Sequence, residues 1–256
     1  MKRTFVFLLA AALLLPACTR EIRTEKLLLK EQVPFSEGSA FNYGLDLDID
    51  FPVAGLENDA LAAMRQHIRT LTLGDAYTGF TGSVDDLKAA WRNAAVDEYR
   101  TSNEDLLKEM NISEAEAFNL NWETMVSGSF GNEWDGCINY LVEQYTYEGG
   151  AHGLSGLFPV VFDKADGQPV PWSRFAPGVS EAAMTALIDR HKFDDLEDTI
   201  SENGIDTDSI FYVDTIEPGR WYSVDKQGLT FFYQPYDVAP YVFGVIEITV
   251  PWEELK

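Results

Sequence analysis

Apolar and polar residues alternate with a period of two from Phe41 to Phe51, which predicts a strand with one buried face. The other face of this strand carries Asp46, Asp48 and Asp50. A calcium loop needs a turn that makes carboxylates converge, whereas a strand spreads them along its length, so we interpret these aspartates as a solvated face. A shorter strand is predicted over residues 24–35, and Pro52 is expected to close the 41–51 strand.

Further along the chain the period changes to that of a helix. One apolar stripe predicts a helix over residues 56–71, with His67 beside the stripe as a partly buried neighbour of the core. Ser83, which acidic residues follow, predicts the start of a second helix, and this helix is expected to break at residues 101–103. A third helix is predicted over residues 178–192. We interpret all three helices as cover for a sheet.

The second half of the chain is rich in predicted strands. They cover residues 119–130, 137–147, 154–162, 221–224, 229–233 and 245–250. Residues 131–136 are expected to form a wide turn between the first two. The fold class is therefore α+β, with an antiparallel sheet and helices packed mainly on one face. We expect a small N-terminal subdomain at residues 41–118 and a larger C-terminal domain at residues 119–256.

The start of the chain has the features of an export signal. Lys2 and Arg3 precede an apolar stretch at residues 5–15, and Leu15-Pro16-Ala17-Cys18 follows. This sequence resembles the lipobox of a bacterial lipoprotein, which implies a signal peptide at residues 1–17 and a lipid on Cys18. Residues 18–40 would then form the lipidated tether and the first strand. The alternative is an ordinary secretory signal in which Cys18 is incidental; both interpretations export the protein.

Composition and charge narrow the choice of partners. Hydrophobic residues make up 46% of the 256 positions, which is enough for a sizeable core. The formal net charge of −23 excludes a nucleic-acid partner and favours either a basic protein partner or simple solubility. Besides Cys18 the chain contains only Cys137, which we interpret as a small core residue, so no disulfide framework is expected.

Polar chemistry clusters at a predicted break between two strands. Tyr147 and Glu148 precede Gly149 and Gly150, and His152 follows. The glycines allow positive φ, so the chain can turn there and present the polar side chains at a rim. The same glycines argue against a helix that would place Glu148 and His152 on one face, and no second orienting group is evident. A polar turn is therefore favoured over a catalytic pair.

A second candidate surface lies between Pro235 and Pro240, which cannot sit inside a central strand. This segment and the residue after it carry Tyr236, Asp237 and Tyr241. The two tyrosines and the carboxylate form either a small recognition surface or a set of packing residues with satisfied hydroxyls.

Several of these segments together carry a family resemblance. They are Tyr147 to Gly153, the turn at residues 163–167, residues 227–229 and residues 232–241. They resemble the C-terminal extracytoplasmic domain of RsiV-type anti-sigma factors, a domain that also accompanies the catalytic domain of PdaC-type peptidoglycan deacetylases. Residues 41–71 are similar to the smaller domain that usually precedes it. In the anti-sigma factors this exterior region binds lysozyme directly.

The resemblance implies a binding role for this chain. We find neither a sigma-binding segment nor a deacetylase domain, so we expect a non-enzymatic lipoprotein of the cell envelope that binds a lysozyme-like protein or peptidoglycan glycan. No cofactor and no metal is expected, and the membrane is contacted through the lipid on Cys18. The alternative is a hydrolase or deacetylase-related enzyme, active on peptidoglycan or carbohydrate, that uses Glu148 and His152. A third possibility is a structural role in a surface assembly.

Overall fold

The computed structural model describes residues 21–196, 200, 206–207 and 210–255. The predicted signal peptide and Cys18 lie outside these residues. Within them, no helix combines the length and the apolar character needed to cross a membrane.

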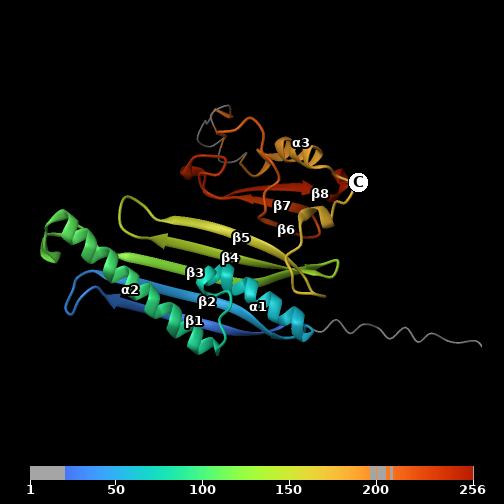
Figure 1. Cartoon of the computed structure of the whole chain (residues 1–256). Coiled ribbons are helices and arrows are strands. Elements are labelled where there is room, and N and C mark those ends of the chain that lie inside the picture. Colours follow the sequence, from blue (N-terminus) through green and yellow to red (C-terminus); the bar gives the residue numbers. More distant parts are fainter. Residues whose placement is uncertain (1–20, 197–199, 201–205, 208–209, 256) are drawn as a thin grey trace, which may run out of the picture.

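The fold is α+β, as predicted, and it is built on two sheets (Figure 1). The first sheet has five strands in chain order, β1 (Arg23–Pro34), β2 (Asn42–Ala54), β3 (Trp122–Trp134), β4 (Cys137–Tyr147) and β5 (Leu154–Asp163). The second has three, β6 (Tyr222–Val224), β7 (Gly228–Tyr233) and β8 (Ile246–Pro251). The α-helices are α1 (Asn58–Leu73), α2 (Val84–Met110) and α3 (Glu181–His191). Short 3-10 helices are η1 (Asp75–Tyr77), η2 (Glu114–Glu116), η3 (Trp172–Arg174), η4 (Asp194–Leu196), η6 (Tyr241–Phe243) and η7 (Trp252–Glu254).

Helices α1 and α2 lie across one face of the five-stranded sheet, and α3 packs on the three-stranded sheet (Figure 1). The alternation in β2 places Leu45, Leu47 and Ile49 in the core with at most 1% of their surface exposed. On its open face, Lys26 and Lys30 of β1 form ion pairs with Asp48 and Asp46. The predicted solvated face is thus a row of cross-strand charge pairs.

The five-stranded sheet contains one parallel pair, β2 with β3, among otherwise antiparallel neighbours. The connection between these two strands contains α1 and α2, which is long enough for the crossover that a parallel pair requires. Pro52 does not close β2, which continues to Ala54. The Pro52 carbonyl accepts a hydrogen bond from Arg65 of α1 and not from a neighbouring strand. Since the nitrogen and carbonyl of one strand residue point to the same side, the N–H that proline lacks would not have bonded to β1.

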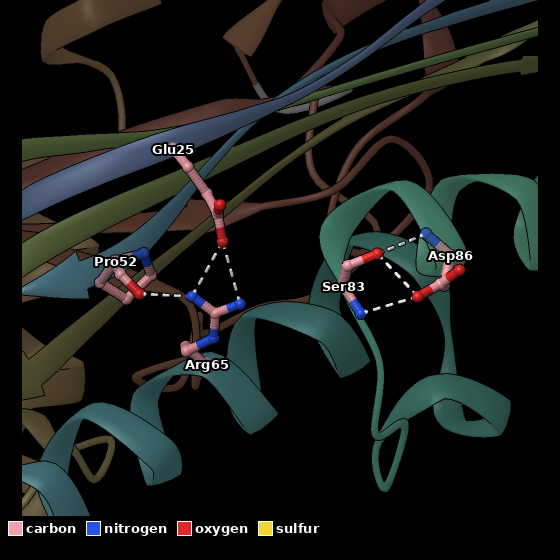
Figure 2. Close-up of polar contacts among 5 residues, drawn as sticks. All are labelled: Glu25, Pro52, Arg65, Ser83 and Asp86. Carbon is pink, nitrogen blue, oxygen red and sulfur yellow. Dashed lines mark hydrogen bonds and ion pairs between the residues drawn. The ribbon is translucent and has the colours of Figure 1, made fainter.

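One group of polar contacts joins α1 to this sheet, and another caps the start of α2 (Figure 2). The guanidinium of Arg65 donates to Glu25 of β1 over 3.1 and 3.2 Å, and Ser83 and Asp86 form a capping box at the start of α2. The predicted break at residues 101–103 is wrong, because α2 runs unbroken to Met110. The Asn103 side chain is buried and donates to the Tyr99 carbonyl one turn earlier, so its amide is satisfied within the helix by sharing a backbone acceptor.

The turn between β3 and β4 is also tighter than predicted. The wide turn expected at residues 131–136 is instead a continuation of β3 to Trp134, and β4 begins at Cys137. Asp135 and Gly136 have φ angles of 46° and 77°, the pair of positive values that suits a two-residue hairpin. A register irregularity between Phe130 and Glu133 absorbs the remaining residues of the expected turn.

Two apolar clusters fill the molecule. One lies between the five-stranded sheet and the first two helices, and the other surrounds the three-stranded sheet and includes the fully buried Cys137. Buried Asn139 of β4 joins the two sheets, since its side-chain amide donates to the Val224 carbonyl and accepts from the Val224 N–H over 2.7 and 2.9 Å. The predicted boundary after residue 118 stays a prediction; the strands on either side of it, β2 and β3, are hydrogen-bonded neighbours. Strand β5 contributes to both clusters, Phe162 to the first and Val161 to the second.

Candidate functional site

The predicted strand, glycine break and strand correspond to the hairpin of β4 and β5. Strand β4 ends at Tyr147 and β5 begins at Leu154. Gly149 and Gly150 have φ angles of 89° and 87°, a conformation that a residue with a side chain adopts only under strain. The hairpin loop therefore depends on these glycines, and it carries Glu148 and His152 at the surface.

The second predicted segment, which follows β7, packs directly against this loop. The Tyr241 hydroxyl donates to the Gly153 carbonyl over 2.8 Å. The rings of His152 and Tyr241 stack with centroids 4.2 Å apart, and those of Tyr236 and Tyr241 stack with centroids 5.6 Å apart. We call these three stacked residues, His152, Tyr236 and Tyr241, the aromatic rim.

The loop that carries the two tyrosines is held in a strained conformation. Tyr236 has a φ of 74°, which is uncommon for a residue other than glycine and costs about 1 kcal/mol or more. A bond from the Tyr236 N–H to the Ala239 carbonyl and one from the Gln234 N–H to the Asp237 carboxylate maintain it. In return the Tyr236 ring is 53% exposed. Backbone strain clusters at functional sites, so Tyr236 stays a candidate recognition residue, while the bonded hydroxyl of Tyr241 also fits the packing alternative.

Tyr147 and Glu148 do not join the aromatic rim. The Tyr147 hydroxyl donates to the Gly150 carbonyl and accepts from the Asn119 amide, so it fixes the inside of the hairpin loop. Glu148 is exposed and lies near Tyr43 of β2: burial raises the pKa of Tyr43, and the Glu148 carboxylate adds to the rise. Among the described residues no contact joins Glu148 to His152.

The rim has few groups suited to acid or base chemistry. His152 Nδ1 lies 2.9 Å from the Gly153 carbonyl, and because that oxygen only accepts, the proton sits on Nδ1. The Asp237 carboxylate is occupied by the loop backbone. Over the part of the chain that the structure describes, no group of three or more His, Cys, Asp and Glu residues is placed to hold a metal ion. The arrangement offers flat aromatic surface at low conformational cost, which suits binding.

An acidic hollow adjoins the rim on the open face of the five-stranded sheet. It has a volume of about 360 Å³ and its lining includes Asp46, Asp48, Glu143 and Tyr145. The Tyr145 ring lies against Gly153, where an added Cβ would come within 2.4 Å of it. Through Tyr145 the hollow is continuous with the hairpin loop that carries His152, so aromatic and acidic surface form one face.

Sequence reasoning missed a second concave region, at the end of β5 away from the rim. This cleft has a volume of about 590 Å³ and is bordered by α1, β5 and the segments at residues 169–172 and 218–222. Its walls include Trp172, Arg220 and Trp221. The adjacent pair Arg220-Trp221 after Pro218 is a signal that could have drawn attention to it, since basic and aromatic neighbours are enriched at binding sites.

The structure thus defines a two-sheet α+β protein whose candidate site is a surface array of stacked rings. Residues 175–253, which contain α3 and the whole three-stranded sheet, match the family described as protein of unknown function DUF3298. Tyr236, Asp237 and Tyr241 lie inside this match, and the β4–β5 hairpin precedes it.

Two crystal structures share the fold along nearly the whole chain. One is a member of the DUF3298 family from Bacteroides fragilis, with a TM-score of 0.77 and 20% identity, where the alignment covers 92% of each chain. The other is a DUF3298 family protein from Pseudomonas aeruginosa, with a TM-score of 0.63 and 17% identity, covering 93% of this chain and 94% of that one. A comparison with curated proteins gives no match. The likeness to RsiV-type and PdaC-type proteins stays a prediction.

Proposed function

We propose that the protein is an exported, lipid-anchored binding module of the bacterial cell envelope, and that it captures a basic, lysozyme-like protein through the aromatic rim. The observation that carries the proposal is the strained, half-exposed Tyr236 stacked on Tyr241, which in turn stacks on His152. Rigid tyrosine rings supply contact area while losing little side-chain entropy, which is why tyrosine is enriched among the residues that dominate binding energy.

Charge supports a basic partner. The chain carries a net charge of −23. Of the three carboxylates that line the hollow beside the rim, Asp46 and Asp48 pair with Lys30 and Lys26, and Glu143 has no ion-pair partner among the described residues. Lysozyme-like proteins are a fitting class because the resemblance to RsiV-type domains rests in part on the two segments that build the rim. Acidic surface around an aromatic centre would speed association, while the rings would supply affinity that survives salt.

The position of the rim supports presentation away from a membrane. Arg23, close after Cys18 in sequence, pairs with Ala54 at one end of the five-stranded sheet. Tyr147 pairs with Glu123 at the other end, where β2 and β3 also align Tyr43 with Trp122. From Tyr43 to Ala54 along β2, at about 3.3 Å per residue, the two ends are about 35 Å apart. A lipid on Cys18 would therefore hold the start of β1 near the bilayer and leave the rim pointing outward.

The test is calorimetric titration of the polypeptide that begins after Cys18, which retains every described helix and strand, with a lysozyme at low and at physiological salt. We expect saturable binding at physiological salt and a loss of at least tenfold in affinity for the double variant Tyr236→Ala/Tyr241→Ala. Phe118→Ala is the matched control, because Phe118 is a fully exposed aromatic residue outside the rim.

Heat that disappears at physiological salt would reduce the interaction to charge attraction and contradict the proposal. Equal losses in the rim and Phe118 variants would also contradict it, because they would indicate nonspecific apolar contact. Saturable binding of soluble peptidoglycan fragments without lysozyme binding would move the assignment to glycan. Turnover of such fragments that Glu148→Gln and His152→Gln abolish would replace it with the enzymatic alternative.

A further inference from the structure

The cleft beside Trp221 is a second concave site, separate from the aromatic rim. Its volume of about 590 Å³ lies in the range of small-molecule pockets. The lining residues are His67, Thr70, Leu71, Val160, Val161, Pro169, Val170, Pro171, Trp172, Pro218, Gly219, Arg220, Trp221 and Tyr222. Four separate segments supply them, so the cleft forms only in the folded chain.

The walls of the cleft are fixed before any ligand arrives. The buried Tyr222 hydroxyl donates to the Val170 carbonyl over 2.7 Å and joins two of the lining segments. The Trp221 ring packs edge to face on Phe158, with ring centroids 5.1 Å apart, and three prolines stiffen the backbone that lines the cleft. Because few side chains have to be ordered on binding, the loss of conformational entropy is small, and such a preformed site favours affinity for a small ligand.

The charge of the cleft is opposite to that of the rest of the molecule. Its lining contains no carboxylate, although the chain has 42 acidic residues and the hollow near the rim contains three of them. The Arg220 guanidinium stacks over the Trp221 ring with its central carbon 4.3 Å from the ring centroid. Within the described part of the chain Arg220 has no ion-pair partner. Stacking orients this guanidinium and leaves its N–H edge for an anion.

A histidine also lines the same cleft. His67 Nε2 lies 3.0 Å from the Gln168 side-chain oxygen, an acceptor, and the His67 ring packs near Phe162. These contacts hold His67 in place, and its Nε2 proton is used by Gln168. A ligand in the cleft meets one fixed cation and a largely apolar, aromatic surface.

The neighbouring edge of β5 is closed to an added strand. The Gln234 side chain accepts from the Leu157 N–H and donates to the Leu157 carbonyl, as a paired strand would. Further along, the Val170 N–H donates to the Val161 carbonyl, and Pro159 between them has no N–H. An extended peptide therefore lacks a free ladder to join, which favours a compact ligand over a strand.

We propose that this cleft binds a small carboxylate, whose charged group pairs with Arg220 and whose apolar body lies against Trp221 and Trp172. An acidic sugar, through the C–H face of its ring, and an acylated amino acid, through its apolar side chain, both present this chemistry. The proposal is independent of lysozyme binding, because the cleft and the rim lie at different ends of β5 and share no lining residue.

The test is titration of the polypeptide that begins after Cys18 with two matched pairs of probes. N-acetylmuramic acid is compared with N-acetylglucosamine, which lacks the carboxylate, and N-acetylphenylalanine is compared with its amide. Binding is followed by calorimetry and by the indole N–H resonance of Trp221, assigned through its loss in Trp221→Phe. We expect at least one acid to bind about tenfold more tightly than its neutral mate, and the pair that shows this preference identifies the source of the carboxylate.

Arg220→Gln should abolish the preference for the acid, whereas Lys226→Gln should leave it unchanged. Both side chains are exposed, and Lys226 lies on the turn between β6 and β7, outside the lining of the cleft. The proposal is overturned if acid and neutral probe bind alike, or if neither acid shifts the Trp221 resonance at about 10 mM. It is also overturned if Arg220→Gln keeps the preference.

Discussion

The aromatic rim and the Arg220 cleft are both built from aromatic side chains at the surface, but they are supported differently. In the rim, His152, Tyr241 and Tyr236 stack on one another, and backbone bonds within two loops hold them. In the cleft, the rings pack against rings of the sheets: Trp221 contacts Phe158 of β5, and Tyr222 packs beside Phe231 of the three-stranded sheet.

This difference predicts how substitutions in each region affect ligand binding and the free energy of unfolding. Rim side chains touch little of the core, so their removal should cost binding and leave folding nearly intact. Cleft side chains close one of the two apolar clusters, so their removal should cost both. The charges differ as well, since acidic residues flank the rim and a cation stands in the cleft, so the two regions should select partners of opposite charge.

The largest contrast should come from Tyr222→Ala set against Tyr236→Ala. Tyr222 is 3% exposed, so its truncation leaves a cavity and removes the bond to Val170, and we expect a loss of about 3–5 kcal/mol in the free energy of unfolding. Tyr236→Ala should change it by about 0.5 kcal/mol or less, because the ring is half exposed. Urea unfolding followed by circular dichroism measures both. Similar losses of unfolding free energy in the two variants would contradict the proposal that the cleft supports the core and the rim does not.

Gln234 joins the rim loop to the edge of β5, and Gln234→Ala should have an intermediate effect. Its side chain bonds to both polar groups of Leu157 on the edge of β5, while its own N–H is bonded by Asp237 in the rim loop. Truncation leaves a partly buried N–H and carbonyl without partners, so we expect a loss of about 1–2 kcal/mol. Hydrogen exchange at the Leu157 amide should accelerate.

The matched control for this variant is Gln227→Ala, on the exposed turn between β6 and β7, which should change stability by about 0.3 kcal/mol or less. If the Leu157 amide keeps its protection in Gln234→Ala, the edge of β5 is closed by something other than this side chain. The argument against strand addition at the cleft would then fail as well.

Local patterns in the sequence predict most of the elements of this fold. The alternation over residues 41–51 and the cap at Ser83 were sufficient because a half-buried strand and a helix start are set by neighbouring residues. The break expected at residues 101–103 was wrong because a buried Asn103 bonds back into its own helix, which depends on tertiary burial. The parallel pairing of β2 with β3 is likewise a property of how distant segments meet.

The candidate site shows the same division. Glycines and prolines marked both loops of the rim as turns, but only the bond from Tyr241 to Gly153 reveals that the loops meet. Glu148 and His152 are close in sequence, yet only His152 stacks in the rim, which sequence spacing does not encode. The cleft was missed because its lining residues are scattered from His67 to Tyr222.

A smaller effect than that of Gln234→Ala, and one specific for the rim, should come from Tyr241→Phe. This variant keeps the ring that stacks between His152 and Tyr236 but removes the hydroxyl that donates to Gly153. The loss in the free energy of unfolding should be about 0.5–1 kcal/mol, and lysozyme affinity should fall only a few-fold, compared with at least tenfold when both rim tyrosines are truncated. Calorimetry measures the free energy of unfolding and the lysozyme affinity, and the ring resonances of His152 show whether the stack on Tyr241 is kept.

Tyr222→Phe is the matched control, because it removes an equivalent hydroxyl-to-carbonyl bond in the cleft wall. It should lower stability by a comparable amount and leave lysozyme affinity unchanged. If Tyr241→Phe weakens binding as strongly as the double truncation, the hydrogen bond that joins the two loops, and not the stacked aromatic surface, is what the partner requires. The rim would then act by holding the β4–β5 hairpin in place, and the contact surface would have to be sought on the hairpin and the acidic hollow beside it.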